Sequence, residues 1–206
     1  MHSNILVVAQ PRSGGTLACA VLSKIHNIPY IGEYFNSHRY GYNIHNQLRD
    51  FPSPAIVKAS FYDLKDNFDE VMELGFKEIY HVNRTDPVGM VCSSFISSIT
   101  DVFHVTKNET HEPVKDKIMD KDFVKWFFSK DNPGGWFYNN SANIPFMEKV
   151  NYHSLYYNDT VDENIMLVQI ANDCYGISVD IKKLYKDKSL AIKNIDEVKG
   201  WVSEYI

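Results

Sequence analysis

Cysteine is scarce in this chain of 206 residues, and the few cysteines form no pattern. Cys19, Cys92 and Cys174 lie far apart, are odd in number and include no CxxC pair. This spacing argues against a disulfide framework and against a zinc knuckle. Dispersed thiols suit a reducing compartment, so we expect the protein to act in the cytoplasm.

The sequence also lacks a hydrophobic run long enough to cross a membrane, and residues 1–4 carry no feature of an export signal. A basic excess is missing as well, because 21 Lys and Arg face 26 Asp and Glu, for a net charge of -5. We therefore expect no membrane span and no nucleic-acid partner. An acidic chain can still hold an anion, since such sites need only a few cations and backbone N–H groups.

The eight histidines do not form a metal-ligand pattern. His104 and His111 share one polar segment, but no third ligand stands at a recognisable spacing from them. We expect no metal ion to take part in the function.

What the sequence does contain is an alternation of buried strands and helices. Residues 4–9 (NILVVA) form a continuous apolar run, which is typical of a central strand in a parallel sheet. Two more strands are expected over 55–59 and 76–83, with helices over 67–74 and from Asp86 onward. The pattern predicts a three-layer α/β fold with a mostly parallel central sheet flanked by helices. The length indicates one domain covering the whole chain.

The second half of the chain is less regular. Residues 100–120 are polar and lack periodicity, which predicts an insertion or a mobile loop over the site. A helix is expected over 122–128, a strand over 146–152 and another helix over 162–175. We expect the lysine-rich tail, 177–206, to pack on the outside of the domain through its apolar residues Leu184, Ile192, Val198 and Trp201.

A polar turn with two glycines follows the first strand. Residues 9–16 (AQPRSGGT) are a near miss to the phosphate-binding pattern G-x-x-x-x-G-K-[ST], with Ala9 for the first glycine and Gly15 for the lysine. Such a loop still directs backbone N–H groups and the positive end of a helix toward an anion. The missing lysine argues against an ATP or GTP enzyme, and Arg12 supplies a cation instead. The alternative is a structural Ser-Gly turn.

Residues 11–16 (PRSGGT) resemble the P-[KR]-S-G-[ST]-T loop of sulfotransferases that use 3′-phosphoadenosine-5′-phosphosulfate (PAPS). This resemblance implies a P-loop-type fold, 3′,5′-adenosine bisphosphate as the product, and no metal. It also implies that the loop cradles the 5′-phosphosulfate through Arg12, Ser13, Gly14, Gly15 and Thr16.

A second loop follows the strand expected over 76–83, and a helix with Cys92 and Ser93 comes after it. The segment is similar to the family's motif in which an arginine and a helix serine grip the 3′-phosphate of PAPS. The resemblance gives these roles to Arg84 and Ser93. The family's serine stands eight positions after the arginine, where this chain has Cys92, so the match to Ser93 needs one extra residue in the turn. The alternative is an arginine capped by Asp86 in a surface turn.

Residues 28–36 (IPYIGEYFN) resemble a segment of bacterial sulfotransferases of the trehalose-modifying type, which implies that Glu33 faces the acceptor and takes its proton. The alternative is a Glu33 that caps or pairs with a neighbouring turn. Residues 55–60 (AIVKAS) match the strand where many animal enzymes of the family carry a catalytic histidine, and Ser60 stands in its place. Lys58 on this buried strand either offsets charge on the transferring sulfonate or extends its ammonium to solvent.

We therefore expect an enzyme that moves a sulfuryl group from PAPS to a hydroxyl or amine of a small-molecule or carbohydrate acceptor. Glu33, Arg12 and Lys58 are the expected catalytic residues. One alternative is a degenerate P-loop nucleotide-binding protein or a kinase-like phosphotransferase. Another is a binding module that has lost catalysis. The sequence defines neither the acceptor nor the oligomeric state, and the aromatic stretch 34–42 fits either an acceptor contact or the core.

Overall fold

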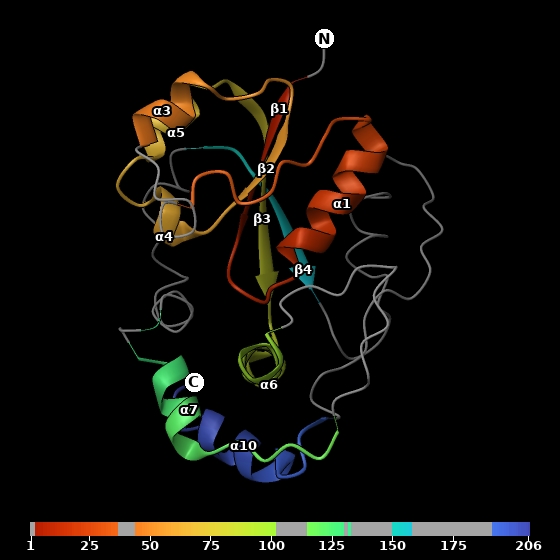
Figure 1. The fold of residues 1–206 in the computed structure, drawn as a ribbon, viewed down its shortest axis with the longest axis vertical. Helices are drawn as coiled ribbons and strands as arrows, with labels where there is room; N and C mark the ends of the chain where they lie inside the picture. The colour runs from red at the N-terminus through yellow and green to blue at the C-terminus, as the bar shows by residue number, and fades with distance from the viewer. Residues whose placement is uncertain (1–2, 37–43, 102–114, 130–131, 133–149, 158–190) are drawn as a thin grey trace.

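Four parallel strands form the centre of the molecule. β1 (Asn4–Ala9) lies between β2 (Ile56–Ala59) and β3 (Phe76–Arg84), and β4 (His153–Tyr157) pairs with β3. The strand order is therefore β2-β1-β3-β4, as Figure 1 shows. The α/β fold with a parallel central sheet is confirmed.

The structure is a computed structural model that describes residues 3–36, 44–101, 115–129, 132, 150–157 and 191–206. Three expectations from the sequence lie outside these residues. They are the helix over 162–175, the contact made by Leu184, and most of the expected insertion, of which residues 102–114 are not described.

β1 lies inside the sheet because neither face of the strand carries a row of polar side chains that could face solvent. All six of its residues are buried. The single polar residue, Asn4, is satisfied by the neighbouring segments: its amide donates to Leu74 O at 2.8 Å, and its side-chain oxygen accepts from Ser53 Oγ and Ala55 N. Buried polar groups are tolerated when they are hydrogen-bonded in this way. Asn4 thus ties the start of β1 to the segments that lead into β2 and β3.

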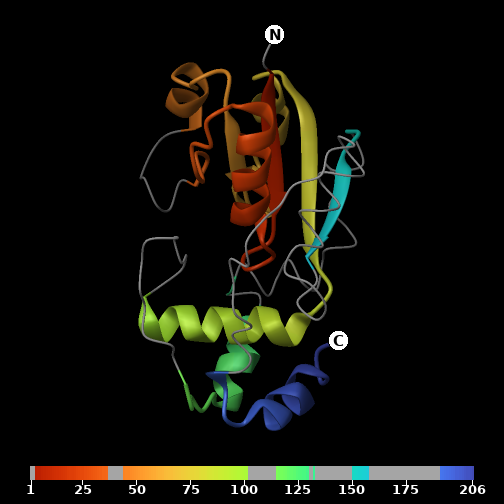
Figure 2. The ribbon, with the colours of Figure 1, turned by 90° about the vertical axis from the view of Figure 1, so that its right-hand side faces the viewer.

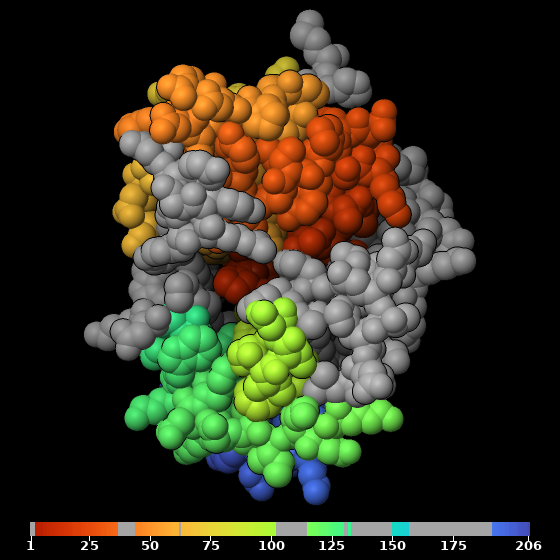
Figure 3. Space-filling view, in the orientation of Figure 1, coloured from red at the N-terminus to blue at the C-terminus, as the bar shows by residue number. Residues whose placement is uncertain are grey.

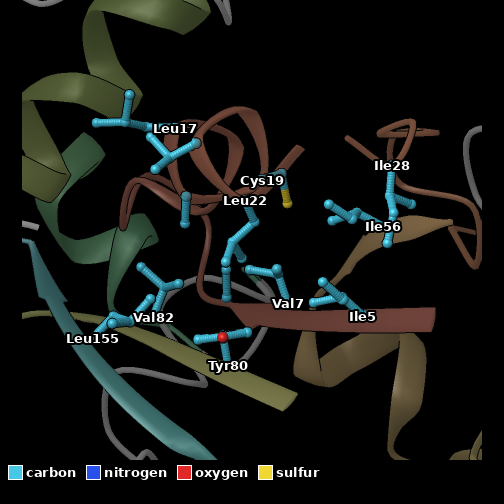
Figure 4. Packing of buried hydrophobic residues seen from close by; sticks show 13 residues of the cluster. Ile5, Val7, Leu17, Cys19, Leu22, Ile28, Ile56, Tyr80, Val82 and Leu155 are labelled. Carbon is cyan, nitrogen blue, oxygen red and sulfur yellow. The ribbon is translucent and has the colours of Figure 1, made fainter. Parts of the chain in front are cut away.

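Helices cover both faces of the sheet, which gives the expected three layers. On one face α1 (Gly15–His26) packs its buried residues onto the sheet. Figure 4 shows Leu17, Cys19 and Leu22 of this helix above Val7 and Tyr80. The other face is covered by three short helices, α3 (Ile44–Arg49), α4 (Phe61–Leu64) and α5 (Phe68–Met72).

Three further helices lie beyond the carboxyl ends of the strands. In Figure 1 the arrowhead of β3 points toward α6 (Pro87–Thr100), and Figure 2 shows α6 running across the end of the sheet. α7 (Lys121–Phe127) and α10 (Ile195–Val202) lie on the side of α6 away from the sheet and share a separate apolar core with it. No helix among the described residues has the length and apolar character needed to cross a bilayer.

The tail therefore does more than pack on the outside. Ile192 and Val198 are buried in the core shared with α6, and Trp201 packs against it. The backbone of Lys117 pairs with residues on both sides of Ile192, donating to Ala191 O at 2.8 Å and accepting from Lys193 N at 2.7 Å. These bonds fix the tail to the segment that follows residue 114.

Residues 146–149 of the strand expected over 146–152 lie outside the described residues, and the described part, 150–152, is not in a strand. β4 begins at His153 because its pairing with β3 starts opposite Tyr80 and runs to Arg84. Within the described residues, 150–152 precede the strand, and Val150 packs against the apolar core on the α4 and α5 face. Val150 thus contributes to packing and not to a strand.

His81 predicts a pH dependence of stability. Its ring is 7% exposed, packs edge-on against Phe61 and Tyr152, and has its Nδ1 within 3.2 Å of Asn83 Nδ2. Burial lowers the pKa of His81 from 6.5 to about 4. Below pH 6.5 His81 becomes protonated in the unfolded chain, whereas in the folded chain it stays neutral down to about pH 4. The free energy of unfolding therefore falls as the pH is lowered through this window.

We expect His81→Gln to remove this loss, which amounts to about 3 kcal/mol between pH 7 and pH 4. Urea unfolding of both proteins at several pH values in this range measures it. His153→Gln, an exposed histidine stacked on Tyr80, serves as the control and should keep the wild-type slope. An identical slope in all three proteins would contradict the assignment.

Candidate functional site

The loop between β1 and α1 contains two residues in the left-handed backbone conformation and a turn closed by hydrogen bonds. Arg12 has φ 67° and Gly14 has φ 91°. Ser13 donates both its backbone N–H and its hydroxyl to Gln10 O, at 3.2 and 2.7 Å, and is fully buried. The Ser13 donors are thus used within the loop. The N–H groups at the start of α1, around Gly14 to Thr16, have no carbonyl one turn earlier in the helix to bind.

Gly15 is required because the chain leaves no room for a side chain there. A Cβ at this position would collide with the Cβ of Ala9 and would lie 3.0 Å from Cδ of Lys58. The last residue of β1, the first residue of α1 and the stem of a lysine from β2 therefore meet at one point. In the phosphate-binding pattern this position carries a lysine, and here the stem of Lys58 lies beside it.

The second loop contacts the first directly. Arg84, at the end of β3, donates from Nη1 to Arg12 O at 3.0 Å, and its Nη2 lies 3.4 Å from Asp86 Oδ2. Arg12 in turn donates from Nε to Ser93 Oγ on α6 at 2.9 Å. The Arg84 side chain is only 8% exposed. In the space-filling view, red atoms from the first part of the chain are visible in a hollow directly above α6 (Figure 3).

The face of α6 decides which residue meets the first loop. Ser93 is the residue whose hydroxyl contacts Arg12, whereas Cys92 is buried in the core shared with α7 and α10. Asp86 caps the helix by accepting from Gly89 N at 2.9 Å, and Pro87 occupies the first turn, as the sequence predicts. Asp86 also contacts Arg84, which is the contact that the alternative interpretation of this turn predicts. The role of Arg84 and Ser93 in phosphate binding stays a prediction.

Lys58 and Glu33 form an ion pair beside the first loop. The Lys58 ammonium is 2.6 Å from Glu33 Oε1 and 3.0 Å from Thr16 Oγ1. The two side chains are 14% and 24% exposed, so neither extends freely to solvent. Asn36 donates to the second carboxylate oxygen of Glu33 at 3.3 Å.

Backbone pairing brings Glu33 to this place. Residues 29–32 run along the outer edge of β2: Ile56 N donates to Pro29 O, Ile31 N to Ile56 O, and Lys58 N to Gly32 O, all within 2.9–3.0 Å. Gly32 then turns the chain with φ 84°. Glu33 follows this turn directly. Its side chain therefore meets that of Lys58, whose backbone N–H binds Gly32 O.

Two other residues near the site have structural roles. Ser60 is the N-cap of α4 and forms a capping box with Asp63. Its hydroxyl donates to Asp63 Oδ2 at 2.6 Å. Tyr34 and Phe35, the described part of the aromatic stretch, pack with Phe51 in the core, and Phe35 is fully buried. The core interpretation therefore holds for these two aromatics.

The sequence did not point to Cys19 as a neighbour of the ion pair. Cys19 lies one turn into α1, and burial raises the pKa of its thiol above its ordinary value, while Lys58 lowers that pKa and Glu33 raises it. Burial thus keeps the thiol protonated, and its pKa is sensitive to both charged groups. Its helical spacing from Thr16 is the signal that could have located it.

The structure brings all of the predicted site residues to one edge of the sheet. One group joins Arg12, Arg84 and Ser93, and the other joins Thr16, Lys58 and Glu33. Both groups touch the same loop of residues 10–16. No protein-family model matches the chain, and no curated protein sequence matches it significantly.

The close approach at Gly15 predicts a large effect of a small change. Gly15→Ala should lower the free energy of unfolding by about 1–3 kcal/mol, because the added methyl must displace Ala9 or the stem of Lys58. Gly200→Ala, in the exposed part of α10 with nothing within 4 Å, is the matched control and should stabilise by up to about 1 kcal/mol. Urea unfolding of the two variants measures both effects, and equal stabilities would contradict the crowding at Gly15.

Proposed function

We propose that this protein is a sulfotransferase that moves a sulfuryl group from PAPS to a hydroxyl or amine of a small-molecule or carbohydrate acceptor. The observation that carries the proposal is the direct contact between the two strand-end loops, made by Arg84 and Arg12. The PAPS donor has an anionic group at each end of its ribose, and two neighbouring cationic loops suit such a molecule. In open α/β sheets, ligands bind at this carboxyl edge.

The first loop would hold the 5′-phosphosulfate. Its backbone turns at Gly14, the first N–H groups of α1 have no partner one turn earlier in the helix, and the loop carries Arg12. Lys58 adds a second cation beside Thr16. We propose that the fold is of the P-loop type on this basis, with the lysine delivered from β2 instead of from the loop.

The second loop would hold the 3′-phosphate. The contact of Arg84 with Asp86, at 3.4 Å, is long for a charge-assisted hydrogen bond, which usually measures about 2.7–2.9 Å. A dianionic phosphate can therefore compete with Asp86 for the same guanidinium. Ser93 orients Arg12 and offers its hydroxyl between the two loops.

The chemical step needs a base for the acceptor and cations for the leaving group. As the acceptor oxygen or nitrogen forms its bond to sulfur, its proton passes to a carboxylate oxygen of Glu33. The bond between sulfur and the bridging oxygen breaks, and 3′,5′-adenosine bisphosphate leaves with the electron pair. Arg12 and Lys58 offset the charge that grows on that oxygen. We expect the reaction to take place in the cytoplasm and without a metal ion.

Arg12→Asn should reduce sulfuryl transfer by a hundredfold or more, on the order expected for one preorganised contact to developing charge. Asparagine tolerates the left-handed backbone that Arg12 adopts, so the loop should keep its shape. Transfer from PAPS to a panel of phenol, amine and sugar acceptors measures the effect. Arg49→Asn, which removes an exposed arginine paired with Asp50, is the control. Equal activity of both variants would exclude Arg12 from the mechanism.

A phosphotransferase is a second candidate, favoured by the Lys58 ammonium at 3.0 Å from Thr16 Oγ1, where a P-loop lysine would act. Thermal unfolding separates the two candidates, because a ligand that binds only the folded chain raises its midpoint. We expect 3′,5′-adenosine bisphosphate to raise the midpoint by several degrees and ATP with magnesium to leave it unchanged. The reverse result would favour the phosphotransferase. Binding of the bisphosphate with no transfer to any acceptor would indicate a binding module.

A further inference from the structure

The ammonium of Lys58 serves two partners that belong to different parts of the proposed reaction. Thr16 lies in the anion-binding loop, and Glu33 is the proposed base. We infer that donor binding activates Glu33: the anion in the loop draws Lys58 away from Glu33 and leaves a carboxylate that accepts a proton more readily. This inference rests on the proposed function and adds a coupling between the two halves of its site.

The distances place Lys58 within reach of both partners. It sits 2.6 Å from Glu33 Oε1 and 3.0 Å from Thr16 Oγ1, so an anion held by the N–H groups around Thr16 would lie next to the ammonium. The stem of Lys58 is fixed against Gly15, which leaves movement to its terminal atoms. A lysine ammonium has three N–H donors and turns readily among acceptors. A small rotation therefore shifts it from carboxylate toward anion.

Movement of the Lys58 ammonium away from Glu33 disfavours the negative charge on the carboxylate, because the pair is shielded from solvent. The Lys58 and Glu33 side chains are 14% and 24% exposed, so solvent screens their attraction less than that of a surface pair. Other described groups near the pair differ from Lys58 in charge or in direction. Cys19 of α1 is a protonated thiol, Asn36 is neutral, and Arg12 is directed toward α6 through Ser93.

The coupling gives the site an order of events. Without a donor, Glu33 is held as the partner of Lys58 and binds the acceptor proton poorly. When the donor binds, Lys58 moves toward the leaving group. The same movement frees Glu33 to accept the proton of the acceptor. An acceptor bound alone is thus not deprotonated.

Proton uptake on anion binding tests the inference. Adenosine 5′-phosphosulfate is a suitable probe, because its phosphosulfate group does not titrate between pH 5 and pH 8. Isothermal titration calorimetry in two buffers with different ionisation enthalpies gives the number of protons taken up. We expect uptake of a substantial fraction of one proton at pH 5.5 and none near pH 8.

Two variants identify the groups. Glu33→Gln should take up no proton and should bind the probe several-fold more tightly, because Lys58 no longer has a charged competitor. Lys58→Met keeps the stem beside Gly15, and it should lower the affinity about tenfold and abolish uptake, since the variant has no ammonium that the anion can draw away from Glu33. Lys121→Met is the matched control, because Lys121 forms an ion pair with Glu204 at the same 2.6 Å in an exposed place. Far-UV circular dichroism checks that each variant is folded.

The results separate this inference from the proposed function. Probe binding with no proton uptake in the wild type overturns the coupling and leaves the donor site intact. Uptake that persists in Lys58→Met also overturns it, because repulsion between anion and carboxylate would then be the cause. If neither the probe nor 3′,5′-adenosine bisphosphate binds, both proposals fail. Uptake in the wild type and the Lys121→Met control, lost in the other two variants, supports the coupling.

Discussion

The first loop has its observed form because position 15 carries no side chain. The crowding of Ala9, Gly15 and Lys58 at one point sets how closely α1 follows β1 and where the lysine stem can go. Close backbone approach is a role that only glycine fills. As a result the ammonium of Lys58 arrives beside Thr16 instead of in solvent. A cation reaches the start of α1 from the neighbouring strand, so the loop needs no lysine of its own.

The second loop depends on parts of the chain that are remote in sequence. α6 presents Ser93 to the first loop and its opposite face to the core shared with α7 and α10. A helix with 3.6 residues per turn separates these faces, which is why adjacent Cys92 and Ser93 point to different surroundings. The packing of α10 against α6 thus fixes the direction in which Ser93 faces Arg12. The C-terminal helix thus supports the candidate site through its packing on α6.

Local features of the fold could be predicted from the sequence, and contacts between distant segments could not. The apolar run of β1 and the Asp86 cap of α6 follow from local patterns and are confirmed. The start of β4 at His153 depends on its register with β3, which local hydrophobicity does not encode, so a strand over 150–152 was wrongly predicted. The sequence identified Glu33 and Lys58 as candidate catalytic residues from their residue types and neighbouring motifs. Their pairing requires residues 29–32 to align with the edge of β2, which is a non-local event.

The charges at the site explain how a chain with a net charge of -5 can hold cations together. Arg12, Arg84 and Lys58 gather near one loop, and the carboxylates of Asp86 and Glu33 accompany two of them. Partly buried like charges destabilise a fold unless counter-charges lie close by. These carboxylates therefore hold the cations in place. Under the proposed function, an incoming anion would exchange with them, so its affinity would depend on how tightly Asp86 and Glu33 hold their partners.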